Sequence, residues 1–150
     1  MTLDDDADLR ARAQRMLDHS EIANIRVIQL SAERLTDVAP DSVNVTSQTS
    51  YIATDETFAN RFEWQADLRD VDNETVAELK ATIVVEFEIA EAFEPDQDAA
   101  EAIAQSTGYF AAYPYVRELF QSACIRLQLN PLVLGMLLHG STHPRRISMP

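Results

Sequence analysis

The stretch Ala111-Ala112-Tyr113-Pro114-Tyr115-Val116-Arg117-Glu118-Leu119-Phe120 decides the fold of the last third of this chain. Residues 98–127 around it are mostly good helix formers, but a proline has no amide hydrogen to donate and its ring collides with the preceding turn. We therefore expect a break or kink at Tyr113-Pro114, where Pro114 can start a second helix with a favourable fixed φ. After the break, apolar residues recur at helical spacing and must face another element, namely Val116, Leu119, Phe120, Ala123, Cys124 and Leu127.

Four strands are predicted upstream of these helices. Branched residues from Ile22 to Leu35 indicate the first, which has apolar groups on both faces, so we expect both faces to be covered. The second begins near Val43, after a turn, and is largely polar. The fourth covers Val76 to Phe93, and a short turn before it favours antiparallel pairing. The third is the clearest, because its apolar residues alternate with polar ones at Phe62, Trp64, Ala66 and Leu68.

The order of elements, strands first and helices last, predicts the α+β class. We expect one domain over 1–150, a four-stranded antiparallel sheet followed by a kinked helical pair packed on one side, with a short N-terminal helix. Its parts are the N-terminal helix at 1–20, the sheet at 22–93, the helices at 97–139 and a flexible tail at 140–150. The N-terminal helix has two interpretations, docking on its own subunit or binding a partner, and the first is favoured.

Charge and composition exclude several classes of partner. The formal net charge of −13 over 150 residues disfavours binding to nucleic acid or to an anionic membrane face. The same acidity also serves solubility, so its sign does not select a partner. The acidic first residues lack the apolar core of a signal peptide, and no apolar run is long enough to span a membrane. We therefore expect a cytoplasmic protein that inserts into no membrane.

Residues typical of catalysis or cofactor binding do not form functional patterns in this chain. None of the three glycines belongs to a phosphate-binding loop, which argues against ATP-driven cycling. His19, His139 and His143 lack the spacing of a metal site, and Cys124 falls on the apolar helical stripe, as a core residue would. We predict no catalytic residue, no metal and no cofactor, and hence no enzyme.

A resemblance to a known family enters through the stretch quoted first. The run Tyr113-Pro114-Tyr115-Val116-Arg117-Glu118, followed by a helix and by Leu127-Gln128-Leu129-Asn130-Pro131-Leu132, resembles the signature of the SecB-like export chaperones. The run Ser106-Thr107-Gly108-Tyr109-Phe110 leads directly into the motif, which is closest to the SecB-like chaperones associated with toxin-antitoxin systems. The resemblance covers Ala104 to Leu138. The chain departs from the pattern after the motif helix, where Ile125-Arg126-Leu127-Gln128 replaces a glycine-containing link and leaves the shape of the groove undefined.

The resemblance implies an ATP-independent chaperone, or holdase, that assembles as a homotetramer from two dimers. The matching residues would then serve helix geometry and subunit structure, and they are Tyr113, Pro114, Tyr115, Arg117 and Glu118. The implied partners are unfolded or nascent polypeptides, with an antitoxin and the SecA export motor as further candidates. Whether the role is protein export or the protection of an antitoxin stays open.

The residues themselves favour binding through apolar surface. The segment after the motif helix holds more leucine than one small core needs, and large apolar surfaces on a folded chain usually have a use. A groove beside a strand edge can hold an extended chain through backbone hydrogen bonds. We predict that clients bind at Val43, Val45, Tyr51, Phe58, Phe120, Leu127, Leu129, Leu132, Leu134 and Met136.

Two other classes of function compete with this interpretation. One is a small α+β enzyme that uses the Phe62/Trp64 sheet face as a pocket, with Glu63, Asp67 or Glu86 as a base. It predicts a monomer or dimer with one enclosed cavity. The other is a structural adaptor, which predicts a single stoichiometric partner and no holdase activity.

Overall fold

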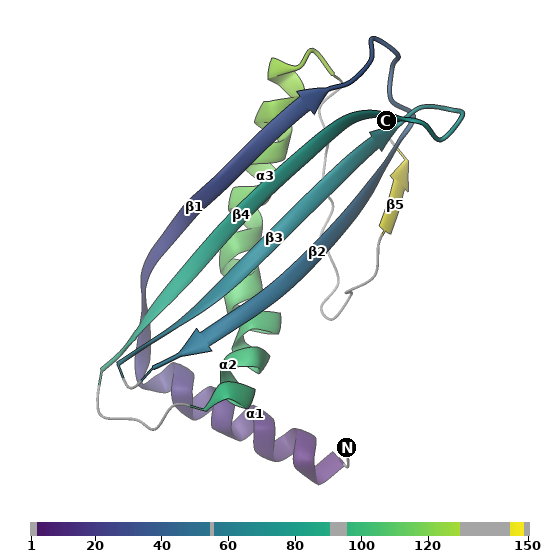
Figure 1. Ribbon diagram of the computed structural model, residues 1–150. Helices are drawn as coiled ribbons and strands as arrows, with labels where there is room; N and C mark the ends of the chain where they lie inside the picture. Colours follow the sequence, from purple (N-terminus) through teal and green to yellow (C-terminus); the bar gives the residue numbers. More distant parts are fainter. Residues whose placement is uncertain (1–2, 55, 91–95, 130–144, 149–150) are drawn as a thin grey trace. The chain divides into compact units, whose positions relative to one another are not determined.

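The computed structural model describes residues 3–54, 56–90, 96–129 and 145–148 (Figure 1). The chain has the α+β class that the sequence predicts, with an N-terminal helix, four long strands and then helices. A fifth short strand was not predicted, and it lies in the region where we expected a flexible tail. The elements are α1 Leu3–Asp18, β1 Ser20–Arg34, β2 Ser42–Ala53, β3 Thr57–Arg69, β4 Thr75–Ile89, α2 Gln97–Ile103, the π-helical turn η1 Ala104–Gly108, α3 Tyr109–Arg126 and β5 Arg145–Ser148.

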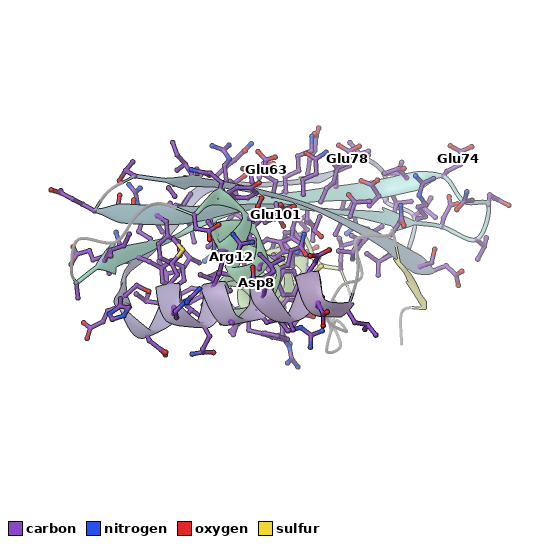
Figure 2. The ribbon with its side chains drawn as sticks, turned by 90° about the horizontal axis from the view of Figure 1, so that it is seen from below. Asp8, Arg12, Glu63, Glu74, Glu78 and Glu101 are labelled. Atoms are coloured by element: carbon purple, nitrogen blue, oxygen red, sulfur yellow. The ribbon has the colours of Figure 1, made fainter. Side chains whose placement is uncertain are left out.

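The strands form one sheet in the order β1-β4-β3-β2-β5. The alternation predicted for β3 is confirmed, because every second side chain from Phe58 to Leu68 is buried and those between them are not. On β4 the buried series runs from Ala77 to Phe87, again every second residue. Glu63 of β3 and Glu78 of β4 project from the other face (Figure 2). The sheet therefore has one apolar and one polar face, as period-two sequences require.

The edge strand β1 differs from the expectation that both of its faces are covered. Nearly all of its fifteen residues are exposed, and only Ser20, Ile25 and Arg34 are partly shielded. Its larger apolar side chains leave between 44% and 49% of their surface open, at Ile22, Val27, Ile28 and Leu30. A long apolar edge of this kind is a template for pairing with another chain.

The described residues group into two compact units, each of which contains parts of the same strands. The first unit comprises Met1–Arg26, Thr49–Phe62 and Val84–Ala112, and the second comprises Val27–Gln48, Glu63–Ile83 and Tyr113–Pro150. The division of the chain into a single domain with the boundaries given above stays a prediction.

In the first unit, α1 contacts α2. Arg12 of α1 forms an ion pair with Asp96 at 2.9 Å and a second with Asp8 of its own helix at 3.1 Å. Asp96 is also the N-cap of α2, because its carboxylate accepts a hydrogen bond from the Ala99 amide at 3.0 Å. Met16 is fully buried. Within this unit α1 therefore docks on its own chain, which is the interpretation that the sequence favoured.

The helix does not break at Tyr113-Pro114, so this part of the prediction is wrong. Pro114 is the sixth residue of α3 and lies inside the helix. The irregular turn is instead η1, which ends one residue before α3 begins. A π-helical turn inserts an extra residue into the helical ladder and changes the direction of the side chains after it. The proline costs α3 one backbone donor, and this loss does not end the helix.

In the second unit, α3 ends in a Schellman motif. The Leu129 amide donates to the Cys124 carbonyl at 2.9 Å and the Gln128 amide donates to the Ile125 carbonyl at 3.1 Å. Gln128 has φ of 56°, in the left-handed region where glycine is preferred. The glycine link missing from the sequence is therefore replaced by a glutamine in the conformation that glycine usually adopts.

Candidate functional site

The strand β2 contributes to both units, and candidate contact residues lie in each of its halves. In the second unit, β2 pairs with β5 in antiparallel register, with Ser42 opposite Ser148 and Val45 opposite Arg145. Val43 is fully buried and Val45 is 5% exposed. The backbone edge of this half of β2 is therefore paired with β5, and its two valine side chains belong to the buried core.

The first-unit half of β2 is tied to α2 by side chains. The Tyr51 hydroxyl donates a hydrogen bond to the Glu101 carboxylate at 3.3 Å, and the Gln97 side-chain amide donates to the Ala53 carbonyl at 3.3 Å. Loss of hydration and the nearby carboxylates of Glu101 and Asp98 raise the pKa of Tyr51 above its usual value. Ile52, which follows Tyr51 on the strand, leaves 64% of its surface exposed.

An aromatic row in the first unit leads from the core to the surface. Phe62 of β3 meets Tyr109 edge to face at 6.0 Å between ring centroids, and Tyr109 meets Phe110 in the same way at 6.1 Å. Phe62 is buried, whereas Phe110 is 52% exposed. The row is a well-anchored apolar contact surface, since the exposed ring is supported by ordered neighbours behind it.

A close approach of β3 to η1 sets the start of this row. A Cβ atom added to Gly108 would collide with the side-chain amide nitrogen of Asn60 and would lie 3.1 Å from its Cγ. Asn60 is fully buried, and neither polar atom of its amide has a hydrogen-bond partner within the part of the chain that the structure describes. Only glycine leaves room for this amide at position 108, one residue before Tyr109.

The structure describes seven of the ten predicted client-binding residues and buries five of them. Val43, Val45, Phe58, Phe120 and Leu129 are buried, while Tyr51 and Leu127 are half-buried. Phe58 stacks on Phe87 at 4.3 Å between centroids, as a core residue does. Leu132, Leu134 and Met136 lie outside the described residues. The assignment of these ten residues to client binding stays a prediction.

The motif residues are divided between core and surface. Tyr113 is buried, and burial raises the pKa of its hydroxyl while the nearby Arg117 opposes this shift. Pro114, Tyr115, Arg117 and Glu118 are exposed. Tyr113 thus packs in the core, and the role of the five motif residues in helix geometry and subunit structure stays a prediction.

Several exposed apolar residues were missed by sequence reasoning. Ile52 of β2 and Phe110, Tyr115 and Ile125 of α3 each expose between 45% and 64% of their surface. All three residues of α3 fall outside the apolar stripe that begins at Val116. Their apolar character off that stripe is the signal that could have identified them.

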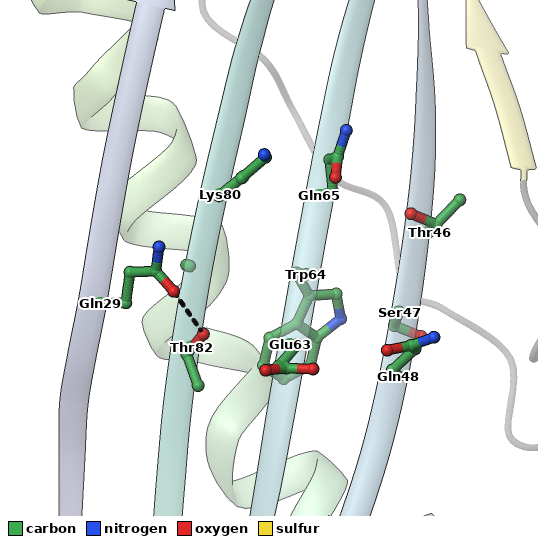
Figure 3. Close-up of a pocket in the computed structure, with 10 residues that line it drawn as sticks. Gln29, Thr46, Ser47, Gln48, Glu63, Trp64, Gln65, Lys80 and Thr82 are labelled. Carbon is green, nitrogen blue, oxygen red and sulfur yellow. Dashed lines mark hydrogen bonds between the residues drawn. The ribbon is translucent and has the colours of Figure 1, made fainter.

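The polar sheet face of the second unit carries a shallow hollow of about 440 Å³ (Figure 3). Glu63, Gln65 and Lys80 line it, and at its border the Thr82 hydroxyl donates to the Gln29 side-chain oxygen at 3.3 Å. The enzyme hypothesis needs a pocket on the opposite face, but Phe62 and Trp64 are 1% and 2% exposed and fill the core. The face proposed for catalysis is therefore packed.

Among the described residues, no group of histidine, cysteine and carboxylate side chains could hold a metal ion. No helix within the described ranges is long and apolar enough to cross a membrane.

The sequence matches no protein-family model and no curated protein. Its structure matches the SecB-like chaperone Rv1957 of Mycobacterium tuberculosis, solved in complex with a ChAD peptide from the HigA1 antitoxin, with a TM-score of 0.76 and 24% sequence identity. The match covers 85% of this chain and 97% of that one. A protein of unknown function from Streptococcus agalactiae aligns more loosely, with a TM-score of 0.42 and 14% identity over 78% of this chain and 97% of that one, and carries no argument.

This chain therefore has the fold of a SecB-like chaperone, which confirms the resemblance found in the sequence at the level of the fold.

Proposed function

We propose that this protein is an ATP-independent chaperone that holds unfolded polypeptide segments in extended form. The observation that carries the proposal is the set of exposed apolar side chains on β2 and α3, on a fold that in Rv1957 was solved with an antitoxin peptide. Such side chains give affinity by burying apolar area at roughly 25 cal/mol per Å², without demanding a sequence. Several weak contacts on one particle then add by avidity, so that no nucleotide is needed.

The aromatic row is the part of the surface best suited to this role. Phe110 presents a large apolar ring that Tyr109 supports. When a client side chain covers this ring, the chaperone therefore loses little side-chain entropy. Ile52 offers a second exposed apolar side chain in the same unit. Exposed aromatic and branched residues of this kind bind many partners, since they recognise apolar area and not a pattern.

The test is suppression of aggregation without nucleotide. A chemically denatured client is diluted into buffer, and light scattering is followed with the protein from sub-stoichiometric to equimolar amounts. We expect the wild type to suppress scattering and the variant Phe110→Ser/Ile52→Ser to need several times more protein. Val71→Ser is the matched control, because Val71 is 80% exposed in the turn between β3 and β4 and belongs to no proposed site. Wild-type protein that leaves scattering unchanged contradicts the proposal.

The assembly that we propose is a homotetramer formed from two dimers. Support comes from β1, an exposed apolar edge strand that a second copy can cover by strand pairing. We expect light scattering coupled to size exclusion to give a mass near four times the 16.8 kDa of one chain. Ile28→Lys/Leu30→Lys should reduce that mass, whereas Val71→Lys should not. A wild-type protein that runs as a monomer at micromolar concentration rules the tetramer out.

The cellular role is proposed to be the protection of an antitoxin in the cytoplasm, with preprotein export and docking to SecA as the alternative. The antitoxin peptide bound to Rv1957 supports this order of preference. Titration with an antitoxin peptide and with an unfolded preprotein separates the two roles. Tighter binding of the preprotein, together with binding to SecA, would favour export.

A further inference from the structure

The second-unit edge of β2 is occupied by the chain's own C-terminal segment. β5 pairs with β2 through four consecutive residue pairs, from Ser42 opposite Ser148 to Val45 opposite Arg145 (Figure 1). In the sheet order, β5 is the outermost strand on this side, so without it β2 would be an edge strand. An uncovered edge presents a row of backbone N–H and C=O groups that any extended chain can pair with.

The covered part of β2 has the pattern of a strand-addition site. Ser42, Val43 and Val45 are buried and Asn44 is half-buried, so this stretch packs beside the core. The four pairs of β5 are few compared with the twelve residues of β2. A strand of four residues is at the short end of the usual range and adds little stability by itself. Its tether to the rest of the chain supplies an effective concentration that keeps it in place.

We propose that the Ser42–Val45 edge of β2 is a strand-addition site for an extended polypeptide, and that β5 is its resident occupant, which a client segment displaces. The proposal rests on the proposed function and names where and how a client backbone is held. Two of the predicted client-binding residues, Val43 and Val45, lie in this stretch. Both side chains belong to the buried core, so a client at this site would pair with the backbone edge beside them.

The occupant indicates the chemistry of the partner. The segment 140–150 carries Arg145 and Arg146 and no acidic residue, whereas the whole chain has a net charge of −13. Because the rest of the protein is acidic, electrostatic attraction favours binding of a basic segment at this edge over binding of an acidic one. We infer that the site prefers extended segments in which basic residues precede a branched apolar residue, as Arg146 precedes Ile147. Backbone pairing supplies affinity and charge supplies the preference.

Displacement by the client makes the apparent affinity depend on β5. When a site is open for only a fraction of the time, the apparent Kd is the intrinsic Kd divided by that fraction. A β5 that is docked nine-tenths of the time therefore weakens client binding about tenfold. Removing its pairing should recover that factor.

The first test disrupts β5 in the full-length protein. Of two adjacent residues in an edge strand, only one points its backbone N–H at the neighbouring strand. The double variant Arg146→Pro/Ile147→Pro therefore removes a pairing N–H whichever of the two residues donates it. The probe is a fluorescent peptide with the sequence of residues 140–150, and its anisotropy is titrated with protein. We expect this variant to bind the peptide about tenfold more tightly than the wild type. Met149→Pro, one residue past the strand, should stay within about twofold. Equal Kd values for the wild type and the double-proline variant overturn the proposal.

The second test locks β5 in place. Asn44 and Arg146 are direct partners in the register, and opposed residues in antiparallel strands are close enough for a disulfide. Oxidised Asn44→Cys/Arg146→Cys should bind the peptide at least about tenfold more weakly than the same protein after reduction. A peptide with glutamate in place of both arginines should bind the reduced protein more weakly than the original. Unchanged binding on oxidation overturns the strand-addition site, and equal binding of the two peptides overturns the charge preference.

These results are separable from the proposed function. Protein that fails to suppress client aggregation, with or without intact β5, contradicts chaperone activity itself. Protein that suppresses aggregation equally in the locked, reduced and double-proline forms keeps its chaperone activity and refutes the role of β5.

Discussion

The two halves of β2 are held by different kinds of interaction. Around Ser42–Val45 the strand is covered by backbone pairing with β5, whereas Tyr51 and Ala53 are tied to α2 by the side chains of Glu101 and Gln97. Backbone pairing is available to any extended chain, but the side-chain ties need particular residues in particular places. The difference teaches that one strand can offer an exchangeable contact at one end and a fixed one at the other.

The largest expected effect comes from Gly108→Ala, which disturbs the first-unit half of β2. The added methyl group collides with the buried Asn60 amide next to η1, which follows the helix α2 that Tyr51 contacts. We expect a loss of about 3 kcal/mol in the free energy of unfolding. Urea denaturation measures it.

The control for this collision is a double-mutant cycle with Asn60→Ala. Removing a buried amide that has no partner in the described structure should cost little by itself and should restore much of the stability lost at position 108. Additive losses in the double variant would show that the steric explanation is wrong.

A second change tests whether side-chain hydrogen bonds also stabilise the second unit. The Arg34 guanidinium donates to the Leu127 carbonyl at 2.9 Å and to the Thr36 carbonyl at 2.9 Å, and so ties the end of α3 to the residues after β1. Arg34→Ala should lower the free energy of unfolding by about 2 kcal/mol, since hydrogen bonds from a charged donor are strong. Arg34→Lys should recover less than half, because an ammonium group cannot reproduce the planar fork. Full recovery by lysine would show that only charge matters here.

A third change tests the C-terminal cap of α3 and should increase stability. Gln128 adopts a left-handed φ of 56° at the Schellman end of α3. Gln128→Gly removes the steric cost of a side chain in that conformation and should raise the free energy of unfolding by about 1 kcal/mol. Gln121→Gly within α3 is the matched control and should lower it by about the same amount. Loss of stability in both variants would contradict the cap.

The smallest expected effect is a pH dependence confined to the fixed half. The pKa of Tyr51 is raised in the folded protein, so the folded state binds this proton more tightly than the unfolded state does. Its contribution to stability is complete below the ordinary tyrosine pKa of 10.0 and is lost as the pH rises through the raised value. Tyr51→Phe should therefore lose stability less steeply than the wild type between about pH 9 and 11. Parallel curves would show that the hydroxyl does not sense Glu101.

The long strands could be predicted from sequence because their burial follows a period of two. Phe62, Trp64 and Leu68 alternate with polar residues, and no competing helical period exists in that stretch. β5 could not be predicted in this way, because four residues define no period and their partner is about a hundred residues away in the chain.

The position of the helix break was mispredicted for a physical reason. Proline is a strong local signal, yet Pro114 lies inside α3. The irregular turn ends at Gly108, where Asn60 leaves no room for a side chain. That requirement depends on a residue in another strand. The client-binding residues were hard to predict for a related reason. Large apolar side chains such as Phe58 and Phe120 occur in a core as readily as on a binding surface, and here both are buried.

The open edge of β1 has a consequence for the protein's own life history. Nearly all fifteen residues of this strand are exposed, and an uncovered strand edge is a template on which misfolded chains can add. In the proposed homotetramer a second copy would cover this edge, so we expect dilution below the assembly concentration to favour aggregation of the protein itself.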